Sequence, residues 1–283
     1  MVAVKIMSIY LVVFILLCYL ALIKCIYYRH RRTLMKSLKR LLSVSSSRDS
    51  DGAEIRALLV TAHPDDECMF FAPTIIRLVE LNASVHLLCL SEGNYYNQGA
   101  QRRQELLNSC AVLGIPASRV TIVDHKKLPD DPKAEWSVSL VSSTIVKHIR
   151  AHSFNVVLTF DGRGVSGHAN HVAIHKAVSE HLATLTADWV SLSSLPDCCL
   201  LSLVTVGLLR KYISFLELPL SWLLPSCLCC IIGSQGYRRA KAAMLCHRTQ
   251  LLWFRYLYIT FSRYMFVNTL RMIPQGPKNL KIY

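Results

Sequence analysis

The sequence predicts an α/β fold, a Rossmann-like, mostly parallel sheet with helices on both faces, preceded by one N-terminal transmembrane helix. Three observations support this fold class. An uncharged apolar run lies near the N-terminus. From Ile55 onward, short β-rich runs alternate with stretches of helical apolar spacing, which is typical of parallel sheets covered by helices. Several predicted strands end in polar loops, and open α/β sheets bind ligands at such strand ends.

The N-terminal apolar run, Ile6 to Ile23, has 18 residues, close to the ~20 that span a hydrocarbon core. Residues 25–28 extend it past Lys24. A cleaved signal peptide is the alternative, but the run is long for a signal and no small-x-small cleavage site follows it. Basic residues are frequent after the run, whereas only Lys5 precedes it. The positive-inside rule therefore predicts a single-pass anchor with the rest of the chain in the cytosol.

The chain divides into four predicted segments. We expect a transmembrane anchor with the start of its basic flank at 1–28, a basic, Ser-rich linker at 29–54, an α/β domain at 55–270 and a C-terminal tail at 271–283. The basic flank also suits a surface of anionic headgroups.

Strands and helices alternate through most of the predicted domain. Strands are expected at 57–62, 85–91, 120–124 and 155–160, and helices at 67–81, 100–113, 138–152 and 168–185. The second helix ends at Gly114-Ile115-Pro116, a combination that stops helices.

The pattern is less regular after Asp188. Residues 200–209 suit a further strand. Residues 212–232 are apolar but interrupted by prolines, which suits either an interfacial segment or a packed core element. Residues 251–266 mix aromatic and basic side chains, as found either at a membrane interface or in a helix packed on the sheet.

The composition restricts the partners. The formal net charge is +14, which favours an acidic partner. No RNP-like aromatic block and no long Lys/Arg run is present, so we expect an anionic membrane surface and no nucleic acid. The 11 cysteines are odd in number and lie mostly in apolar runs, as is typical of reduced, buried thiols. The oligomeric state stays open.

The first strand runs directly into His63-Pro64-Asp65-Asp66-Glu67. Four ionisable side chains thus stand at one strand end, where several of them can converge on one ion. Zinc accepts imidazole nitrogen and carboxylate oxygen, and a catalytic zinc typically keeps three protein ligands and one open position. An acidic helix start would explain Asp65 to Glu67, but it would not explain the histidine before the proline.

The fourth strand runs into a second polar loop that ends in His168-Ala169-Asn170-His171. The two histidines are three residues apart at a helix start, which places them on one face. Such a pair is often incidental by itself. Beside His63 and Asp66, at the same predicted sheet edge, it indicates a metal site.

A glycine pattern in the second loop offers a competing interpretation. Gly162-x-Gly164-x-x-Gly167 matches the dinucleotide-binding fingerprint, and Asp188 follows about 20 residues on. However, that fingerprint belongs to the first βα unit, and this loop follows the fourth strand. We favour glycines that let the backbone bend close to a substrate.

Taken together, these loops resemble the zinc-dependent sugar de-N-acetylases of the LmbE-like superfamily, and within it the eukaryotic family that acts on N-acetylglucosaminyl-phosphatidylinositol in GPI-anchor synthesis. The motifs behind the closer match are Ala62–Pro73, Gly93–Gly99, Pro129–Pro132, Gly164–His171 and Leu251–Arg255. The resemblance runs from about Leu58 to Asn268. It implies a Rossmann-like fold and an endoplasmic-reticulum enzyme whose catalytic domain faces the cytosol.

The resemblance also implies roles for the site residues. His63, Asp66 and His171 would bind Zn²⁺, or another divalent metal, and leave one position for water. Asp65 would take the proton from that water. His168 would stabilise the developing oxyanion or protonate the leaving amine.

Four further side chains have less defined roles. Glu67 would position the first loop. Arg102 matches a family arginine suggested to contact substrate, with a solvated helix charge as the alternative. Asn94 is a second candidate for substrate binding, and Arg163 is a candidate for the lipid phosphate because of its location.

The implied reaction releases acetate from a lipid-linked sugar and leaves the free amine. The sequence leaves three alternatives: a deacetylase of another N-acetylated sugar, a non-catalytic dinucleotide-binding module, and a membrane scaffold with an inactive site. The predicted anchor counts against the first. The second gives no role to His63 or Asp66, and the intact loops count against the third.

Overall fold

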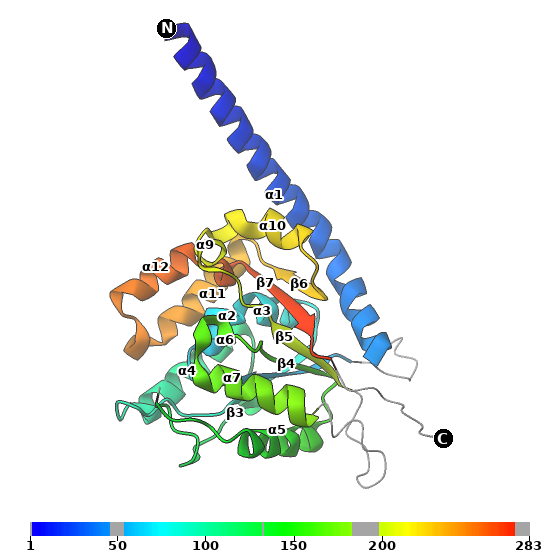
Figure 1. Ribbon diagram of the computed structural model, residues 1–283, viewed down its shortest axis with the longest axis vertical. Helices are drawn as coiled ribbons and strands as arrows, with labels where there is room; N and C mark the ends of the chain where they lie inside the picture. The colour runs from blue at the N-terminus through cyan, green and yellow to red at the C-terminus, as the bar shows by residue number, and fades with distance from the viewer. Residues whose placement is uncertain (1, 46–53, 132, 183–197, 275–283) are drawn as a thin grey trace.

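A single mixed sheet forms the centre of the protein. The computed structural model describes residues 2–45, 54–131, 133–182 and 198–274. Within them, seven strands lie in the order β3-β2-β1-β4-β5-β7-β6 (Figure 1). The strands are β1 (Arg56–Thr61), β2 (Ser84–Cys89), β3 (Val120–Ile122), β4 (Val156–Phe160), β5 (Cys199–Leu203), β6 (Leu228–Ile231) and β7 (Val267–Met272).

Helices connect the strands and cover the sheet. The α-helices are α1 (Val2–Ser45), α2 (Asp66–Phe70), α3 (Ala72–Glu80), α4 (Gly99–Leu113), α5 (Val138–His152), α6 (Gly164–Gly167), α7 (Ala169–Lys176), α9 (Leu208–Lys211), α10 (Leu218–Leu223), α11 (Ser234–Cys246) and α12 (Trp253–Phe261). Short 3-10 turns are η1 (Ala117–Arg119), η3 (Ser214–Glu217), η4 (Arg248–Gln250) and η5 (Arg263–Met265), and α7 continues into the π-helical segment η2 (Ala177–Leu182).

The predicted parallel sheet is confirmed for the first five strands. β1 pairs in parallel with β2 on one side and with β4 on the other. The direction of strand addition therefore reverses beside β1, and such a switch point opens a ligand crevice at the carboxyl ends of the two strands. Both strands are almost wholly buried, as expected for a parallel sheet covered on both faces.

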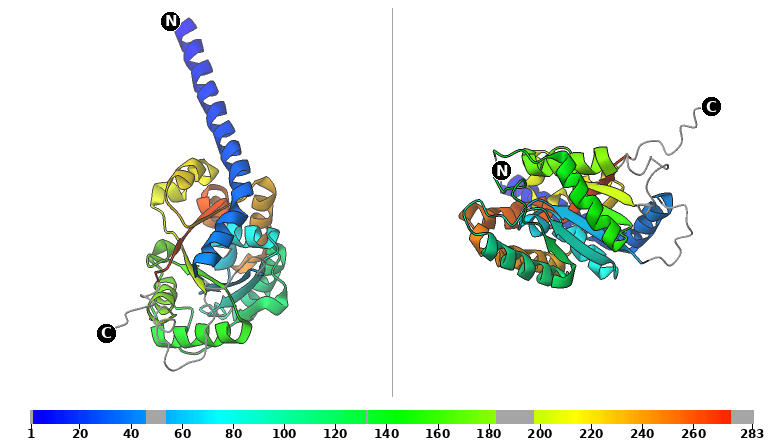
Figure 2. Two further views of the ribbon diagram at one scale, coloured as in Figure 1. Left: turned by 90° about the vertical axis from the view of Figure 1, so that its right-hand side faces the viewer. Right: turned by 90° about the horizontal axis from the view of Figure 1, so that it is seen from below.

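Helices on both faces are also confirmed (Figures 1 and 2). Side chains alternate across the pleat, so that Leu59 and Leu87 join one core while Leu58 and Leu88 join the other. The first core includes apolar residues of α1, α3, α4 and α11. The second lies under α5 and α7.

One predicted helix is broken in two. The helix expected at 67–81 divides at Phe71 into α2 and α3. The side chain of Asn268, from β7, fills the break: its Oδ1 accepts hydrogen bonds from the amide and hydroxyl of Thr74, and its Nδ2 donates to the carbonyl of Phe70. Because this amide comes from almost 200 residues away, local spacing did not reveal the break.

The C-terminal part extends the sheet with two unpredicted antiparallel strands. β7 pairs antiparallel with both β5 and β6. Residues 212–232 therefore contain a core strand as well as η3 and α10, and residues 271–272 of the predicted tail belong to β7. The strand expected at 200–209 ends at Leu203. Residues 46–53, 183–197 and 275–283, which include Asp188, lie outside the described residues.

The N-terminal helix is longer than the predicted anchor. α1 continues to Ser45, through positions expected to form a linker, because it packs on the domain. Its buried residues Ile26, His30, Leu34 and Leu38 recur every four positions and form one stripe of the helix. Its N-terminal portion is exposed, and the helix is long and apolar enough to cross a membrane by length and composition.

A buried ion pair near α10 yields a prediction on stability. Arg263 and Glu217 have fully buried side chains, and Arg263 Nε lies 3.1 Å from Glu217 Oε2. Glu217→Ala would leave the guanidinium buried without its partner, so we expect a loss of about 3–5 kcal/mol of unfolding free energy. Denaturant titration of the purified chain in detergent measures this loss.

The matched control is Arg103→Ala, which removes a pair with Glu92 near the surface. This change should cost less than about 1 kcal/mol. Similar losses for both variants would contradict the expected cost of the buried charge.

Candidate active site

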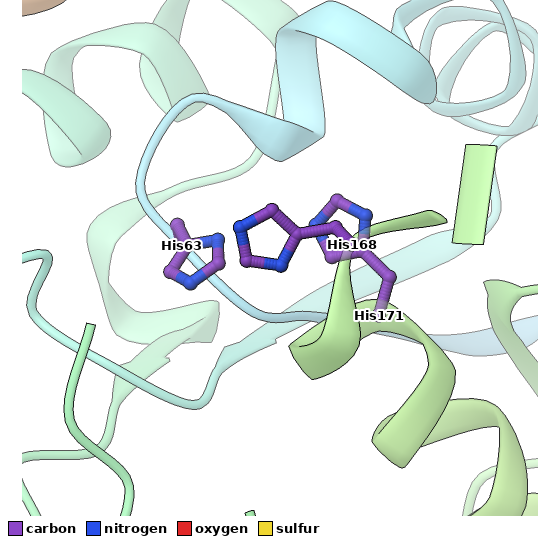
Figure 3. Close-up of side chains that lie close together, drawn as sticks. All are labelled: His63, His168 and His171. Carbon is purple, nitrogen blue, oxygen red and sulfur yellow. The ribbon is translucent and has the colours of Figure 1, made fainter. Parts of the chain in front are cut away.

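Two loops meet at the switch point of the sheet. His63 follows β1, while His168 and His171 follow β4, and their rings face one another (Figure 3). One nitrogen from each ring lies within 4.8 Å of the others. The ring centroids of His63 and His168 are 4.8 Å apart, as are those of His168 and His171. The structure thus brings together three histidines from two distant loops.

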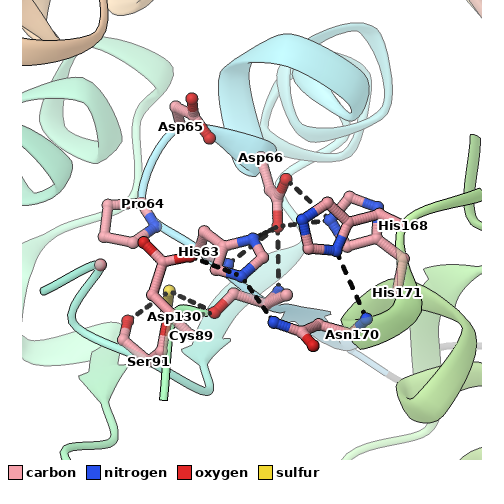
Figure 4. A network of polar contacts seen from close by, with 12 residues as sticks. His63, Pro64, Asp65, Asp66, Cys89, Ser91, Asp130, His168, Asn170 and His171 are labelled. Carbon is pink, nitrogen blue, oxygen red and sulfur yellow. Dashed lines mark hydrogen bonds and ion pairs between the residues drawn. The ribbon is translucent and has the colours of Figure 1, made fainter. Parts of the chain in front are cut away.

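Asp66 links the two loops (Figure 4). Its Oδ2 accepts hydrogen bonds from the backbone amides of Ala62 and His63, at 3.0 and 2.9 Å. Its Oδ1 lies 3.1 Å from His171 Nε2. Burial opposes ionisation, but the charge and hydrogen bond of His171 hold the pKa of Asp66 below its usual value. The carboxylate is therefore ionised and fixed toward the histidines.

The orientation of His171 is fixed by a hydrogen bond at Nδ1 and by ring stacking. Its Nδ1 donates to the carbonyl of Gly164 at 3.1 Å, which leaves Nε2 directed at Asp66. Its ring stacks on Phe160, with centroids 3.8 Å apart. A ligand imidazole is commonly oriented in this way through its second nitrogen. Although burial opposes it, Asp66 raises the pKa of His171.

The glycine-rich loop after β4 packs closely against His171. Gly164 has a φ of +55°, and a Cβ there would lie 3.0 Å from the Cβ of His171. A side chain at Gly164 would therefore be strained and would crowd the imidazole. The close packing of the loop against His171 accounts for a glycine at position 164 without a bound dinucleotide.

His63 contacts polar groups from three elements. Its Nε2 lies 3.0 Å from Asn170 Nδ2 and 3.2 Å from Asp130 Oδ1, and its Nδ1 lies 3.9 Å from Asp66 Oδ2. Burial lowers the pKa of His63 to about 4. The ring is therefore neutral at neutral pH, which is the form that binds metals.

His168 is the N-cap residue of α7 and lies at the pocket wall. Its Nδ1 accepts a hydrogen bond from the amide of Asn170 at 3.3 Å. In the neutral ring, Nε2 then carries the proton and can donate it. Burial lowers the pKa of His168.

Asp65 has an unusual backbone conformation for a residue other than glycine. Its φ is 112°, in the left-handed region that costs free energy for such a residue. Its amide donates to Glu67 Oε2 at 3.1 Å, and its Oδ2 lies 3.2 Å from Arg255 Nη2. Burial, opposed by Arg255, raises the pKa of Asp65 to about 6. A buried carboxylate with such a pKa is suited to exchange protons near neutral pH.

Glu67 lies behind the loop, outside the pocket lining. Its Oε1 accepts hydrogen bonds from Ser109 and from His247 Nε2, the latter at 2.8 Å. Cys68 lies next to this pair, but burial raises the pKa of its thiol well above the usual value. These residues form a buried support for Asp65. His247 was missed by sequence analysis because a single histidine between two helices gives no signal.

A pocket of ≈ 350 Å³ opens over these groups. It is lined by His63, Asp65, Asp66, Met69, Phe70, Tyr95, Tyr96, Arg102, Asp130, Ser166, His168, His171, Gln250 and Arg255. Neither Asp130 nor Arg255 had an assigned role, although both lie in motifs of the resemblance. Asn94 and Arg163 are exposed and do not line the pocket.

Arg102 is buried in the pocket wall. Its Nη2 donates to the carbonyl of Pro64 at 2.8 Å, and its Nη1 donates to the carbonyl of Gly93 and to Asp130 Oδ2, at 3.1 and 2.8 Å. A Cβ on Gly93 would lie 2.5 Å from the guanidinium. Arg102 is therefore not a solvated helix charge, and it joins three loops of the site.

Comparisons with known proteins identify similar sequences. The PIG-L family model, described as GlcNAc-PI de-N-acetylase, matches residues 58–182. A Bos taurus protein named N-acetylglucosaminyl-phosphatidylinositol de-N-acetylase is 49% identical, over 78% of this chain and 85% of its own length. A Dictyostelium discoideum protein named as a probable enzyme of the same kind is 34% identical, over 76% and 92%.

The fold also matches solved structures. N,N'-diacetylchitobiose deacetylase from Pyrococcus horikoshii aligns with a TM-score of 0.56 at 15% identity, and the alignment covers 89% of this chain and 96% of that one. At this identity, the match shows a shared fold.

Substitution can test which of the candidate residues bind a metal ion. We expect His171→Ala and Asp66→Ala to weaken zinc affinity by more than the roughly 10–100-fold that loss of an outer partner costs. His168→Ala should retain the metal. Elemental analysis after dialysis against buffered zinc measures this.

His175→Ala is the matched control, since His175 lies one turn further along α7 and bonds the carbonyl of Phe160 instead. Unchanged zinc in His171→Ala would remove His171 from the ligand set. Loss of zinc in His168→Ala would add His168 to it.

The contacts of Arg102 predict a loss of structure around the pocket on its removal. Arg102→Ala leaves Asp130 and two carbonyls without their donor, so we expect about 3 kcal/mol lower unfolding free energy and similar losses of turnover on lipid-linked and soluble substrates. Arg102→Lys keeps the charge and should recover part of the stability. A KM increase confined to the lipid-linked substrate, with unchanged stability, would instead indicate headgroup contact.

Proposed function

The chain belongs to the PIG-L family of GlcNAc-PI de-N-acetylases, and from this we propose that it hydrolyses the acetamide of N-acetylglucosaminyl-phosphatidylinositol in a metal-dependent reaction. The products are acetate and glucosaminyl-phosphatidylinositol, an early intermediate of GPI-anchor synthesis. The main support is the convergence of Asp65, Asp66 and three histidines in one pocket at the switch point.

The residues present fit a divalent metal ion. Imidazole nitrogens and a buried carboxylate lie close together, and this donor set suits zinc, with another divalent metal as the alternative. His63, Asp66 and His171 would hold the ion. When bound, such an ion lowers the pKa of water and polarises a carbonyl group.

Asp65 is proposed to act as the general base. Its carboxylate lines the pocket, and Arg255 and the amide bond to Glu67 hold it in place. It accepts the proton of the water that attacks the acetyl carbonyl. Arg255 keeps part of the carboxylate population ionised at neutral pH by opposing the effect of burial.

His168 is proposed to assist the departure of the amine. With Nδ1 accepting from the amide of Asn170, its Nε2–H is available to the pocket. This group donates a hydrogen bond to the developing oxyanion or protonates the leaving nitrogen.

An apolar segment in α1 supports a lipid-linked substrate. α1 offers an exposed apolar segment near its N-terminus, with basic residues following it. We propose a single-pass protein of the endoplasmic-reticulum membrane with its catalytic domain in the cytosol. A deacetylase of a soluble sugar would not need this segment.

The function is tested by acetate release from N-acetylglucosaminyl-phosphatidylinositol in nanodiscs, with and without chelator. We expect release that stops with chelator and returns with added zinc. Release that resists exhaustive chelation would contradict the metal requirement. A preparation with bound zinc that releases acetate only from soluble N-acetylated sugars would favour the alternative substrate.

The role of Asp65 yields a separate prediction. Asp65→Asn should keep its zinc and lose roughly 10²–10⁴-fold in turnover, since general base catalysis contributes about that factor. Single-turnover kinetics and elemental analysis on the same preparation measure both quantities. Asp124→Asn, at an exposed position, serves as control. Loss of zinc from Asp65→Asn would make Asp65 a ligand instead.

A further inference from the structure

Exposed apolar side chains are concentrated at one end of the domain. They lie on the stretch from α9 to α10, residues 208–224, and on residues 252–261 around α12. We call this surface the apolar face. Trp253 is 75% exposed and Leu223 is 72% exposed. Outside α1, only Tyr95, Tyr96 and Leu245 among the described residues are large, apolar and exposed elsewhere. Such a concentrated surface marks an interaction site.

The position of α1 indicates what the apolar face meets. α9, α10 and α12 lie at the end from which α1 projects, and α5 lies at the opposite end (Figures 1 and 2). The hydroxyl of Tyr19 donates to the carbonyl of Leu216 in η3. Tyr19 precedes the end of the apolar run by four residues, or roughly 6 Å along the helix. A bilayer crossed by α1 would therefore reach the level of η3 and α10.

A second pocket connects the apolar face with the catalytic pocket. It has a volume of ≈ 630 Å³ and lies against Tyr212, Trp253, Leu257 and Phe261. Met69, Phe70, Ser166 and Arg255 line both pockets. The two pockets are thus adjacent parts of one cleft, polar at the histidines and apolar at the exposed surface.

Two cations line the apolar pocket of the cleft. Arg255 borders both pockets, and Lys211 borders the apolar one. Lys211 Nζ lies 5.6 Å from the ring centroid of Tyr212, and it has no carboxylate partner within the described residues. Burial and the nearby charge of Arg255 lower the pKa of Lys211. An anionic group between them would relieve this repulsion.

We infer that the pocket between α9 and α12 receives the phosphodiester and the adjoining acyl segment of a phospholipid directly from the bilayer, while the apolar face is seated at the headgroup boundary. Lys211 and Arg255 would face the phosphate, and the aromatic side chains of α12 the acyl chain. The identity of the sugar on this lipid rests on the proposed function. The seating of the face rests on its continuity with α1.

This inference places the phosphate away from Arg163. Arg163 lines neither pocket, whereas Lys211 lines the apolar pocket together with Arg255, which also borders the catalytic pocket. The sugar would then extend inward from the phosphate toward Asp65 and His168, so that the lipid stays in the membrane while its headgroup enters the site.

Photocrosslinking tests the seating without reference to catalysis. The full chain is placed in nanodiscs that contain phosphatidylinositol with a diazirine on one acyl chain, and labelled peptides are mapped by mass spectrometry. We expect labels on α10 and α12 as well as on residues 6–23, and none on α5. Labels confined to α1 would overturn the inference.

Kinetics test the phosphate contact. Lys211→Gln should lower the ratio of kcat/KM for the lipid-linked substrate to that for N-acetylglucosaminyl-inositol by about tenfold, as expected for loss of one charge-assisted contact. Lys211→Arg should restore the ratio. Trp253→Ser with Leu257→Ser should lower it by at least about tenfold through lost apolar burial. Leu245→Ser, an exposed apolar residue outside the face, is the control. An unchanged ratio in the first and third variants would overturn the assignment.

The proposed function and the proposed seating of the apolar face can be contradicted independently of each other. Labels on α10 and α12 without acetate release would support the seating and contradict the proposed function. Acetate release with labels confined to α1 would support the function and contradict the seating.

Discussion

The site depends on one buried carboxylate, that of Asp66, which joins the loops at the ends of β1 and β4. Its Oδ2 accepts hydrogen bonds from two backbone amides of the first loop, and both of its oxygens contact His171 Nε2 of the second loop, at 3.1 and 3.2 Å. A buried carboxylate left without partners costs several kcal/mol, so this set of contacts determines the relative position of both loops. The three histidines are neighbours because these loops are held together.

A second layer of buried polar contacts supports this junction. Ser109 and His247 hold Glu67 in place. Glu67 accepts a hydrogen bond from the backbone amide of Asp65, the residue with the left-handed conformation. Arg102 connects the first loop to Asp130. Connected hydrogen-bond networks of this kind restrict side chains to one geometry, which a hydrolytic site needs because small displacements reduce the rate. Residues that do not touch the reacting atoms therefore help to position the side chains that do.

The continuous α1 helix couples the orientation of the site to that of the exposed apolar segment. The stripe from Ile26 to Leu38 packs on the domain, so the described chain contains no flexible joint between the apolar segment and the point where α1 leaves the core. The orientation of the catalytic cleft then follows from the orientation of the helix. In the proposed membrane-bound arrangement, a lipid headgroup would therefore meet the cleft at a set height, which a flexible tether would not ensure.

The sequence alone determined the parallel part of the sheet, the helices between its strands and the two loops that form the site, because these follow from local apolar periodicity and from motifs at strand ends. Tertiary structure decided what depends on distant residues. Asn268 divides α2 from α3, His247 supports Glu67, Arg255 pairs with Asp65, and β6 and β7 complete the sheet. Each of these contacts joins segments more than 30 residues apart, so no local pattern records it. The motif His63-Pro64-Asp65-Asp66-Glu67 indicated the class of reaction, and only the fold showed which side chains contact each of its acidic residues.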